Sequence, residues 1–122
     1  MTTTAAVAAD LVALCKAGSY AAAGEKYWAK DVVSVEAGAP QGGDPASRGK
    51  AAVRGKSEWW AANHDIHAME THGPYLNGDQ FTVRFQIDVT FKPTGQRMQM
   101  DEVALYTVRD GMITEERFFV TA

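Results

Sequence analysis

The residues of this 122-residue chain that could do chemistry are carboxylates placed among apolar side chains. Glu36 ends the valine-rich segment 31–36 and stands at the start of a loop rich in glycine and proline. From such a place, a side chain can enter a cavity between two layers of structure. Glu36 is therefore a candidate for acid/base chemistry.

Glu102 lies in an apolar stretch of the chain and is a second candidate. The alternation of a strand places it on one face with Met98, Met100 and Tyr106. An ionised carboxylate on such a face costs several kcal/mol unless it is paired or protonated. Two interpretations therefore stay open. Glu102 either pairs with an arginine of a neighbouring strand, Arg84 or Arg97, or it is an acid that faces a pocket.

Other charged residues are expected to face solvent. Glu115 and Glu116 lie side by side in the last apolar segment and are predicted to form an exposed charged edge. Four basic residues near the start of a helical stretch are predicted to form its solvated face, and a rim that attracts anionic ligands is the alternative. These are Arg48, Lys50, Arg54 and Lys56.

The three histidines, His64, His67 and His72, suggest a metal site only by their number. If residues 65–75 form a strand, His67 and His72 point to opposite faces, because they are an odd number of residues apart. The sequence contains no zinc-binding pattern of histidines and cysteines. We therefore expect structural or surface histidines and no metal, and His67 as a pocket acid or base is the alternative.

Large side chains that could surround a ligand come from two parts of the chain. Aromatic rings in a helical layer belong either to the core or to the walls of a cavity that takes a hydrophobic molecule. The candidates are Tyr27, Trp28, Trp59 and Trp60 from this layer, with Met100 and Tyr106 from the segment that carries Glu102.

The pattern of the chain predicts an α+β fold with a mostly antiparallel sheet. Apolar and polar residues alternate from residue 81 to residue 91, and turn signals at 92–95 and at Asp110-Gly111 separate this strand from two more, over 97–109 and 112–120. Upstream, helices are expected over 5–17, 20–30 and 50–63, the last with a break near Gly55. Shorter strands are expected over 31–36 and 65–75, and residues 38–49 should form a loop. The helices would then cover one face of a curved sheet, and any site would lie between the two layers.

Length and composition limit the function classes. The chain is long enough for one domain, since single cores commonly have about 100–150 residues. Its formal net charge of −3 gives no support to nucleic-acid binding. No apolar run reaches the roughly 20 residues that span a bilayer, and the start lacks the pattern of a signal peptide. The single cysteine, Cys15, rules out an internal disulfide, which fits a reducing compartment. Together these features lead us to expect a cytoplasmic protein without a membrane partner.

Several segments together resemble a known family. These are residues 27–36, 48–55, 73–74 with 78–81, and 106–113 with Glu116. They are similar to the SnoaL-like branch of the nuclear transport factor 2-like superfamily, which also contains the ketosteroid isomerases. The resemblance spans nearly the whole chain. It implies a cone-shaped roll in which the sheet wraps around the N-terminal helices and leaves a deep, mostly apolar pocket. It also implies a homodimer formed through the sheet face that is turned away from the helices, and catalysis without a cofactor in those members that are enzymes.

The resemblance also suggests roles for single residues. Glu36 falls where the isomerases place their general base, whereas Ala104 stands where the isomerases and the polyketide cyclases carry a second acid. Glu102, two residues earlier on the same face, is a substitute for that acid, and His67 is the other candidate proton donor. These candidate acid/base residues are compatible with two functions. The protein either binds a small hydrophobic molecule and catalyses cofactor-free isomerisation or cyclisation, or it is a non-catalytic module for ligand binding or dimerisation.

Overall fold

The alternating C-terminal third forms three long antiparallel strands, as predicted. A computed structural model describes residues 2–39 and 42–121. Within these ranges the sheet has six strands in the spatial order β2-β1-β6-β5-β4-β3. Neighbouring strands are antiparallel except β1 and β6, which are parallel. The strands are β1 (Trp28–Val35), β2 (Ala46–Arg48), β3 (His64–Asn77), β4 (Gln80–Phe91), β5 (Gln96–Arg109) and β6 (Met112–Val120).

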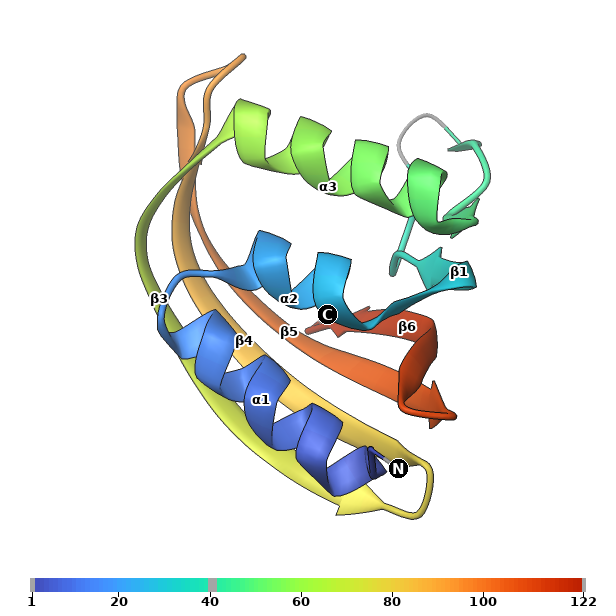
Figure 1. The fold of residues 1–122 in the computed structure, drawn as a ribbon. Helices are drawn as coiled ribbons and strands as arrows, with labels where there is room; N and C mark the ends of the chain where they lie inside the picture. The colour runs from blue at the N-terminus through green and yellow to red at the C-terminus, as the bar shows by residue number, and fades with distance from the viewer. Residues whose placement is uncertain (1, 40–41, 122) are drawn as a thin grey trace.

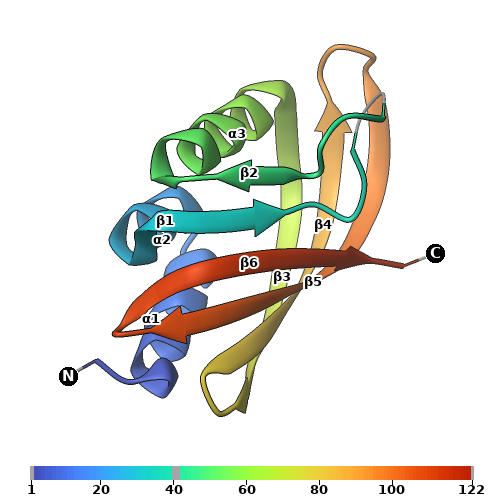
Figure 2. The ribbon, with the colours of Figure 1, turned by 90° about the vertical axis from the view of Figure 1, so that its right-hand side faces the viewer.

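Three helices, α1 (Thr4–Lys16), α2 (Tyr20–Tyr27) and α3 (Lys50–Asn63), lie on the concave side of this sheet. Figure 1 shows β3, β4 and β5 curving around all three of them. Figure 2 shows the opposite edge, where β2 and β1 extend the sheet beyond β6 and lie next to α3. This arrangement confirms the predicted α+β fold with a curved, mostly antiparallel sheet. None of the described helices is long and apolar enough to cross a bilayer.

The core forms between α1 and the inner face of the sheet. Val7, Leu11 and Cys15 are buried on one side of α1 at helical spacing. The inner residues of β4, among them Phe81 and Val83, are buried opposite them. Complete burial of each such valine, leucine or phenylalanine contributes about 1.5–3 kcal/mol. The helical layer is therefore fixed firmly against the sheet at this end.

Local signals set most of the element boundaries. The Thr3 side chain accepts a hydrogen bond from the Ala6 amide at 3.1 Å and begins α1. Asp110 and Gly111 have φ values of 54° and 75°, which is the left-handed geometry of a tight hairpin turn between β5 and β6.

Three predicted boundaries were wrong. α2 ends at Tyr27 rather than at residue 30, because Trp28 is extended and pairs with Ile113 of β6. α3 is one continuous helix through Gly55, since a single glycine lowers helix stability without breaking a packed helix. The loop over 38–49 contains the short strand β2, which pairs with β1.

Candidate functional site

A cavity of about 870 Å³ lies between the inner face of the sheet and the helices. This is the size of a small-molecule site. At its buried end, Leu11, Cys15 and Ala23 are at most 5% exposed. At its rim, Trp59 is 54% exposed. Most of the wall is apolar or aromatic, so the few polar groups that reach it decide its chemistry.

α3 supplies one wall of the cavity. Val53, Lys56 and Trp60 line it, and their spacing of three and four residues places them on one side of the helix. On the other side of α3, Arg54 forms an ion pair with Glu25 of α2. The basic residues of this helix were predicted to share one solvated face. That prediction was wrong for Lys56, whose amino group turns inward.

Glu102 of β5 lines the cavity and has no ion-pair or hydrogen-bond partner within the part of the chain that the structure describes. Burial, reinforced by the nearby charge of Glu36 and opposed by that of Lys56, raises its pKa to about 7. Near neutral pH its carboxyl group is therefore present in both protonated and ionised forms. The alternative prediction, a salt bridge to an arginine of a neighbouring strand, was wrong.

The two arginines considered as partners of Glu102 lie on the other face of the sheet. Arg84 pairs with Asp101 at 2.7 Å, and Arg97 pairs with Asp88 at 2.7 Å. Since successive residues of a strand point to opposite faces, the arginines of β4 and β5 are directed away from the cavity.

Glu36 lies just beyond β1 and also lines the cavity. Its Oε1 atom is 2.8 Å from Nζ of Lys56, and the side chain of Glu36 is 41% exposed. The structure therefore brings Glu36 and Glu102 to the same cavity, as expected. It differs from the expectation in giving Glu36 a cationic partner, whereas Glu102 has no such partner among the described residues.

Glu116 of β6 is buried, so the prediction that it forms an exposed edge with Glu115 was wrong. Its two carboxylate oxygens accept hydrogen bonds from Nε1 of Trp28 at 2.5 Å and from Oγ of Ser34 at 3.0 Å. Lys56 donates in turn to the Ser34 hydroxyl. Burial raises the pKa of Glu116, and the Trp28 donor, Lys56 and Ser34 oppose that shift. Alternation along the strand is the signal that could have identified Glu116, because two adjacent glutamates in a strand cannot both face outward.

Of the predicted aromatic wall, Trp28, Trp59, Trp60 and Tyr106 line the cavity, and so does Met100. Tyr27 does not. Its hydroxyl donates to Asp10 on α1, where Lys26 forms an ion pair with the same carboxylate. Tyr27 therefore links α2 to α1 instead of facing a ligand.

His67 also lies outside the cavity, which corrects its prediction as a pocket acid or base. It is exposed, and its Nε2 atom lies 2.7 Å from the Thr90 hydroxyl. The irregularity of β3 between Ile66 and Ala68 changes the orientation of the strand at this point. His64 lines the cavity instead, and its ring stacks on Trp60 at 4.2 Å.

The structure offers no evident place for a metal ion among residues 2–39 and 42–121. No three or more histidine, cysteine, aspartate or glutamate side chains gather there in a way that could hold one.

Comparison with known proteins identifies the family. A family model for the SnoaL-like domain matches residues 1–120. The chain belongs to the SnoaL-like domain family. It is 52% identical to a candidate SnoaL-like polyketide cyclase from Mesorhizobium loti, with a TM-score of 0.90 over 97% of this chain and 99% of that one. A comparison with functionally curated proteins found no match.

More distant structures share the fold of this SnoaL-like protein. An NTF2-like protein from Burkholderia xenovorans is 21% identical, with a TM-score of 0.77 over 97% of this chain and 88% of that one. A protein of cystatin-like fold from Xanthomonas campestris is 19% identical, with a TM-score of 0.79 over 99% of this chain and 92% of that one. The fold that the resemblance to the NTF2-like superfamily implied is therefore confirmed.

Proposed function

We propose that this SnoaL-like protein binds a small, mostly hydrophobic carbonyl compound and transfers a proton at a carbon activated by the carbonyl group. The observation that carries the proposal is Glu102, an unpartnered carboxyl group on the wall of an apolar cavity, whose burial raises its pKa to about 7. A general acid or base works best when its pKa lies near the working pH.

In the proposed reaction, the ionised Glu102 carboxylate removes a proton from the substrate carbon. The electron pair of the broken C–H bond moves into the carbonyl group and forms an enolate. When the enolate is conjugated with a double bond, the protonated Glu102 returns the proton to another carbon, which gives an isomer. In a ring closure, the enolate carbon attacks a second carbonyl group, and Glu102 gives its proton to the alkoxide that forms. Glu102 is assigned this role in preference to Glu36, because the Glu36 carboxylate is already bound to Lys56 at 2.8 Å.

The proposal can be tested without the natural substrate. 2-Tetralone has acidic protons next to its carbonyl group, and NMR follows their exchange for deuterium in D₂O. The protein should accelerate this exchange, and Glu102→Gln should reduce the acceleration by about a hundredfold or more. Glu58→Gln, at an exposed position of α3, is the matched control and should exchange like wild type. Equal rates for wild type and Glu102→Gln would contradict the assignment.

A non-catalytic binding module is the second candidate function. The ion pair between Glu36 and Lys56 and the two hydrogen bonds to Glu116 favour it, because they leave these groups fully engaged. In that case 2-tetralone would broaden or shift the NMR signals of residues that line the cavity. Its protons would exchange for deuterium no faster than in buffer without protein.

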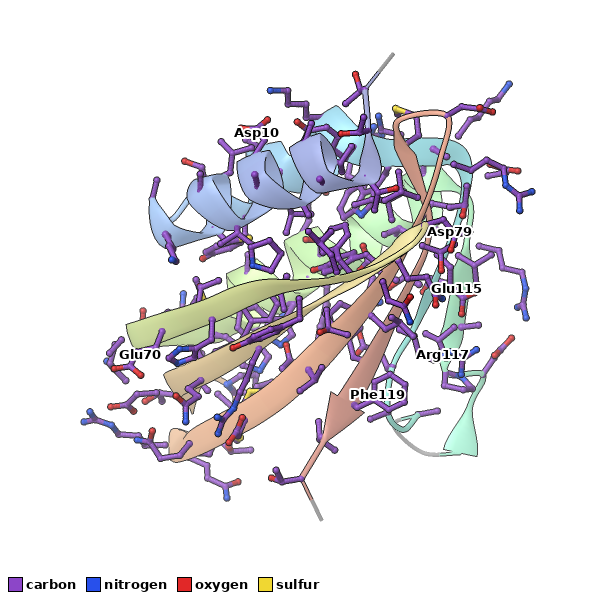
Figure 3. All side chains as sticks on the ribbon, turned by 90° about the horizontal axis from the view of Figure 1, so that it is seen from below. Asp10, Glu70, Asp79, Glu115, Arg117 and Phe119 are labelled. Carbon is purple, nitrogen blue, oxygen red and sulfur yellow. The ribbon has the colours of Figure 1, made fainter. Side chains whose placement is uncertain are left out.

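We further propose a homodimer formed through the outer face of the sheet. Figure 3 shows Glu115, Arg117 and Phe119 following one another along β6. Phe119 is 49% exposed and pairs in register with Val103 of β5. Tyr75 of β3 is 62% exposed. Contiguous apolar patches on a sheet face mark interaction sites, and we expect Phe119 to belong to one.

Light scattering coupled to size exclusion tests the dimer. Wild type should elute with the mass of two chains, and Phe119→Lys should shift the population to one chain. Glu58→Lys on α3 is the control and should remain dimeric. A monomeric wild type would contradict the proposal.

A further inference from the structure

Tyr106 is a buried residue whose hydroxyl is accessible from the cavity and has no hydrogen-bond partner among the described residues. Tyr106 is 6% exposed and lines the cavity. No hydrogen bond to its hydroxyl is present among residues 2–39 and 42–121, whereas buried Glu116 on the neighbouring strand accepts two. Buried tyrosine hydroxyls usually have a hydrogen-bond partner. A partner at this position would have to come from the content of the cavity.

The ring of Tyr106 is held in a fixed orientation. It stacks on Phe81 of β4 with 4.8 Å between ring centroids and 20° between planes. In the sheet, Tyr106 lies between Phe81 on one side and Glu116 on the other. A ligand would therefore meet a donor whose place is set before binding, which lowers the entropic cost of the contact.

The surroundings keep this hydroxyl protonated. Burial raises the pKa of Tyr106 well above its ordinary value, and the charge of Glu116 adds to the shift. A neutral phenol can donate one hydrogen bond, whereas an ionised one can only accept. Tyr106 is thus a donor throughout the physiological pH range.

We propose that the Tyr106 hydroxyl donates a hydrogen bond to an oxygen of the ligand and fixes which end of the ligand enters the cavity first. The ligand class that fits is a hydrophobic, ring-sized molecule with a carbonyl oxygen at its buried end. The inference deepens the proposed function, because it rests on the cavity being the ligand site, but it does not require Glu102 to catalyse a reaction.

Glu102 lies on the same face of β5, four residues before Tyr106. At about 3.3 Å per residue, their Cα atoms are roughly 13 Å apart along the strand. Both side chains line the same cavity, so a small ketone can contact either of them and a longer ligand can contact both.

A matched pair of probes tests the hydrogen bond. 2-Acetylnaphthalene and 2-isopropenylnaphthalene have nearly the same shape, but only the ketone has an acceptor oxygen. Affinity is measured by fluorescence titration of wild type and Tyr106→Phe. Loss of one buried hydrogen bond should weaken ketone binding roughly three- to tenfold. Binding of the isopropenyl compound, which cannot accept a hydrogen bond, should be unchanged.

A spectroscopic readout separates this role from a merely structural one. The stretching frequency of a ¹³C-labelled carbonyl in the bound ketone should be lower in wild type than in Tyr106→Phe. The phenylalanine retains the ring that stacks on Phe81, and thermal unfolding of the variant verifies its fold.

The outcomes are distinct from those of the exchange experiment. Equal weakening of both probes, or no weakening and no frequency shift, would overturn the inference. Failure of both probes to bind wild type would overturn the ligand class itself. If the ketone binds through Tyr106 but 2-tetralone does not exchange, the inference stands and the catalytic proposal fails.

Discussion

The amino group of Lys56 lies 2.8 Å from Oε1 of Glu36 and also donates to the hydroxyl of Ser34. Through Ser34 it connects to the buried carboxylate of Glu116. One lysine therefore balances a cluster of carboxyl groups on one wall of the cavity. The charges of this cluster shift the pKa of Glu102, which is the member without a direct partner among the described residues.

This charge balance predicts how substitutions change the pKa of Glu102. The charge of Glu36 raises that pKa and the charge of Lys56 lowers it. Glu36→Gln should therefore move the pKa of Glu102 below about 7, and Lys56→Met should move it above this value. The titration can be followed by NMR of protein labelled with ¹³C at glutamate carboxyl carbons. An unchanged pKa of Glu102 in both variants would show that the charges of Glu36 and Lys56 do not act on it.

The raised pKa of Glu102 also predicts a dependence of stability on pH. Because the folded state binds the Glu102 proton more tightly than the unfolded state, this stabilisation is present below the ordinary value of 4.5 and is lost as pH rises through about 7. Glu102→Gln cannot ionise and should be more stable than wild type at pH 8, by about 3 kcal/mol.

Urea unfolding of both proteins at pH 5, 6, 7 and 8 measures this effect. The difference between their free energies of unfolding should grow in favour of Glu102→Gln as pH rises. A constant difference across this range would mean that Glu102 titrates alike in the folded and unfolded states.

Glu116 should matter for stability far more than its neighbour Glu115. Glu116→Leu leaves the Trp28 indole N–H without its acceptor inside the protein, so the free energy of unfolding should fall by about 3 kcal/mol. Glu115→Leu, in which only an exposed ion pair to Arg117 is lost, should change it by less than about 1 kcal/mol. Chemical denaturation of the two variants compares them, and similar losses at the two positions would contradict the buried network.

Two helical glycines provide a test of the packing around Trp28. A Cβ atom at Gly24 of α2 would lie 2.5–2.8 Å from the Trp28 indole. Gly24→Ala should therefore displace that ring and destabilise the protein by roughly 1–3 kcal/mol. At Gly55 of α3 a Cβ atom would meet nothing within 4 Å. Gly55→Ala should stabilise the protein by about 0.5–1 kcal/mol. Urea unfolding, followed by tryptophan fluorescence, measures the free energy of unfolding of the two variants. Equal changes in the two variants would show that Trp28 is not packed as described.

The sequence predicted the sheet well because alternation and turn residues are local signals. The strand over 81–91 and the hairpin at Asp110-Gly111 needed no information from the rest of the chain. The end of α2 was missed because Trp28 is fixed by a contact with Glu116, which is distant in sequence. The local sequence pattern does not predict such a contact.

The candidate site was predicted in part for the same reason. Glu102 was found because it interrupts an apolar segment, and Glu36 because it ends one at the start of a loop. Lys56 was missed because its helix carries basic residues on several sides, and only packing shows which one turns inward. Tyr27 and His67 were misplaced because their orientation depends on a helix end and on an irregular strand, neither of which the residue types reveal.

Whether Glu102 can transfer protons near neutral pH is tested by an NMR titration of its carboxyl carbon in the wild-type protein. The signal is assigned by its absence in Glu102→Gln. We expect a midpoint near pH 7, where a carboxyl group that faces an apolar cavity can both give and take a proton. A midpoint near the ordinary value of 4.5 would mean that Glu102 is solvated or paired in solution, and would contradict its role in proton transfer.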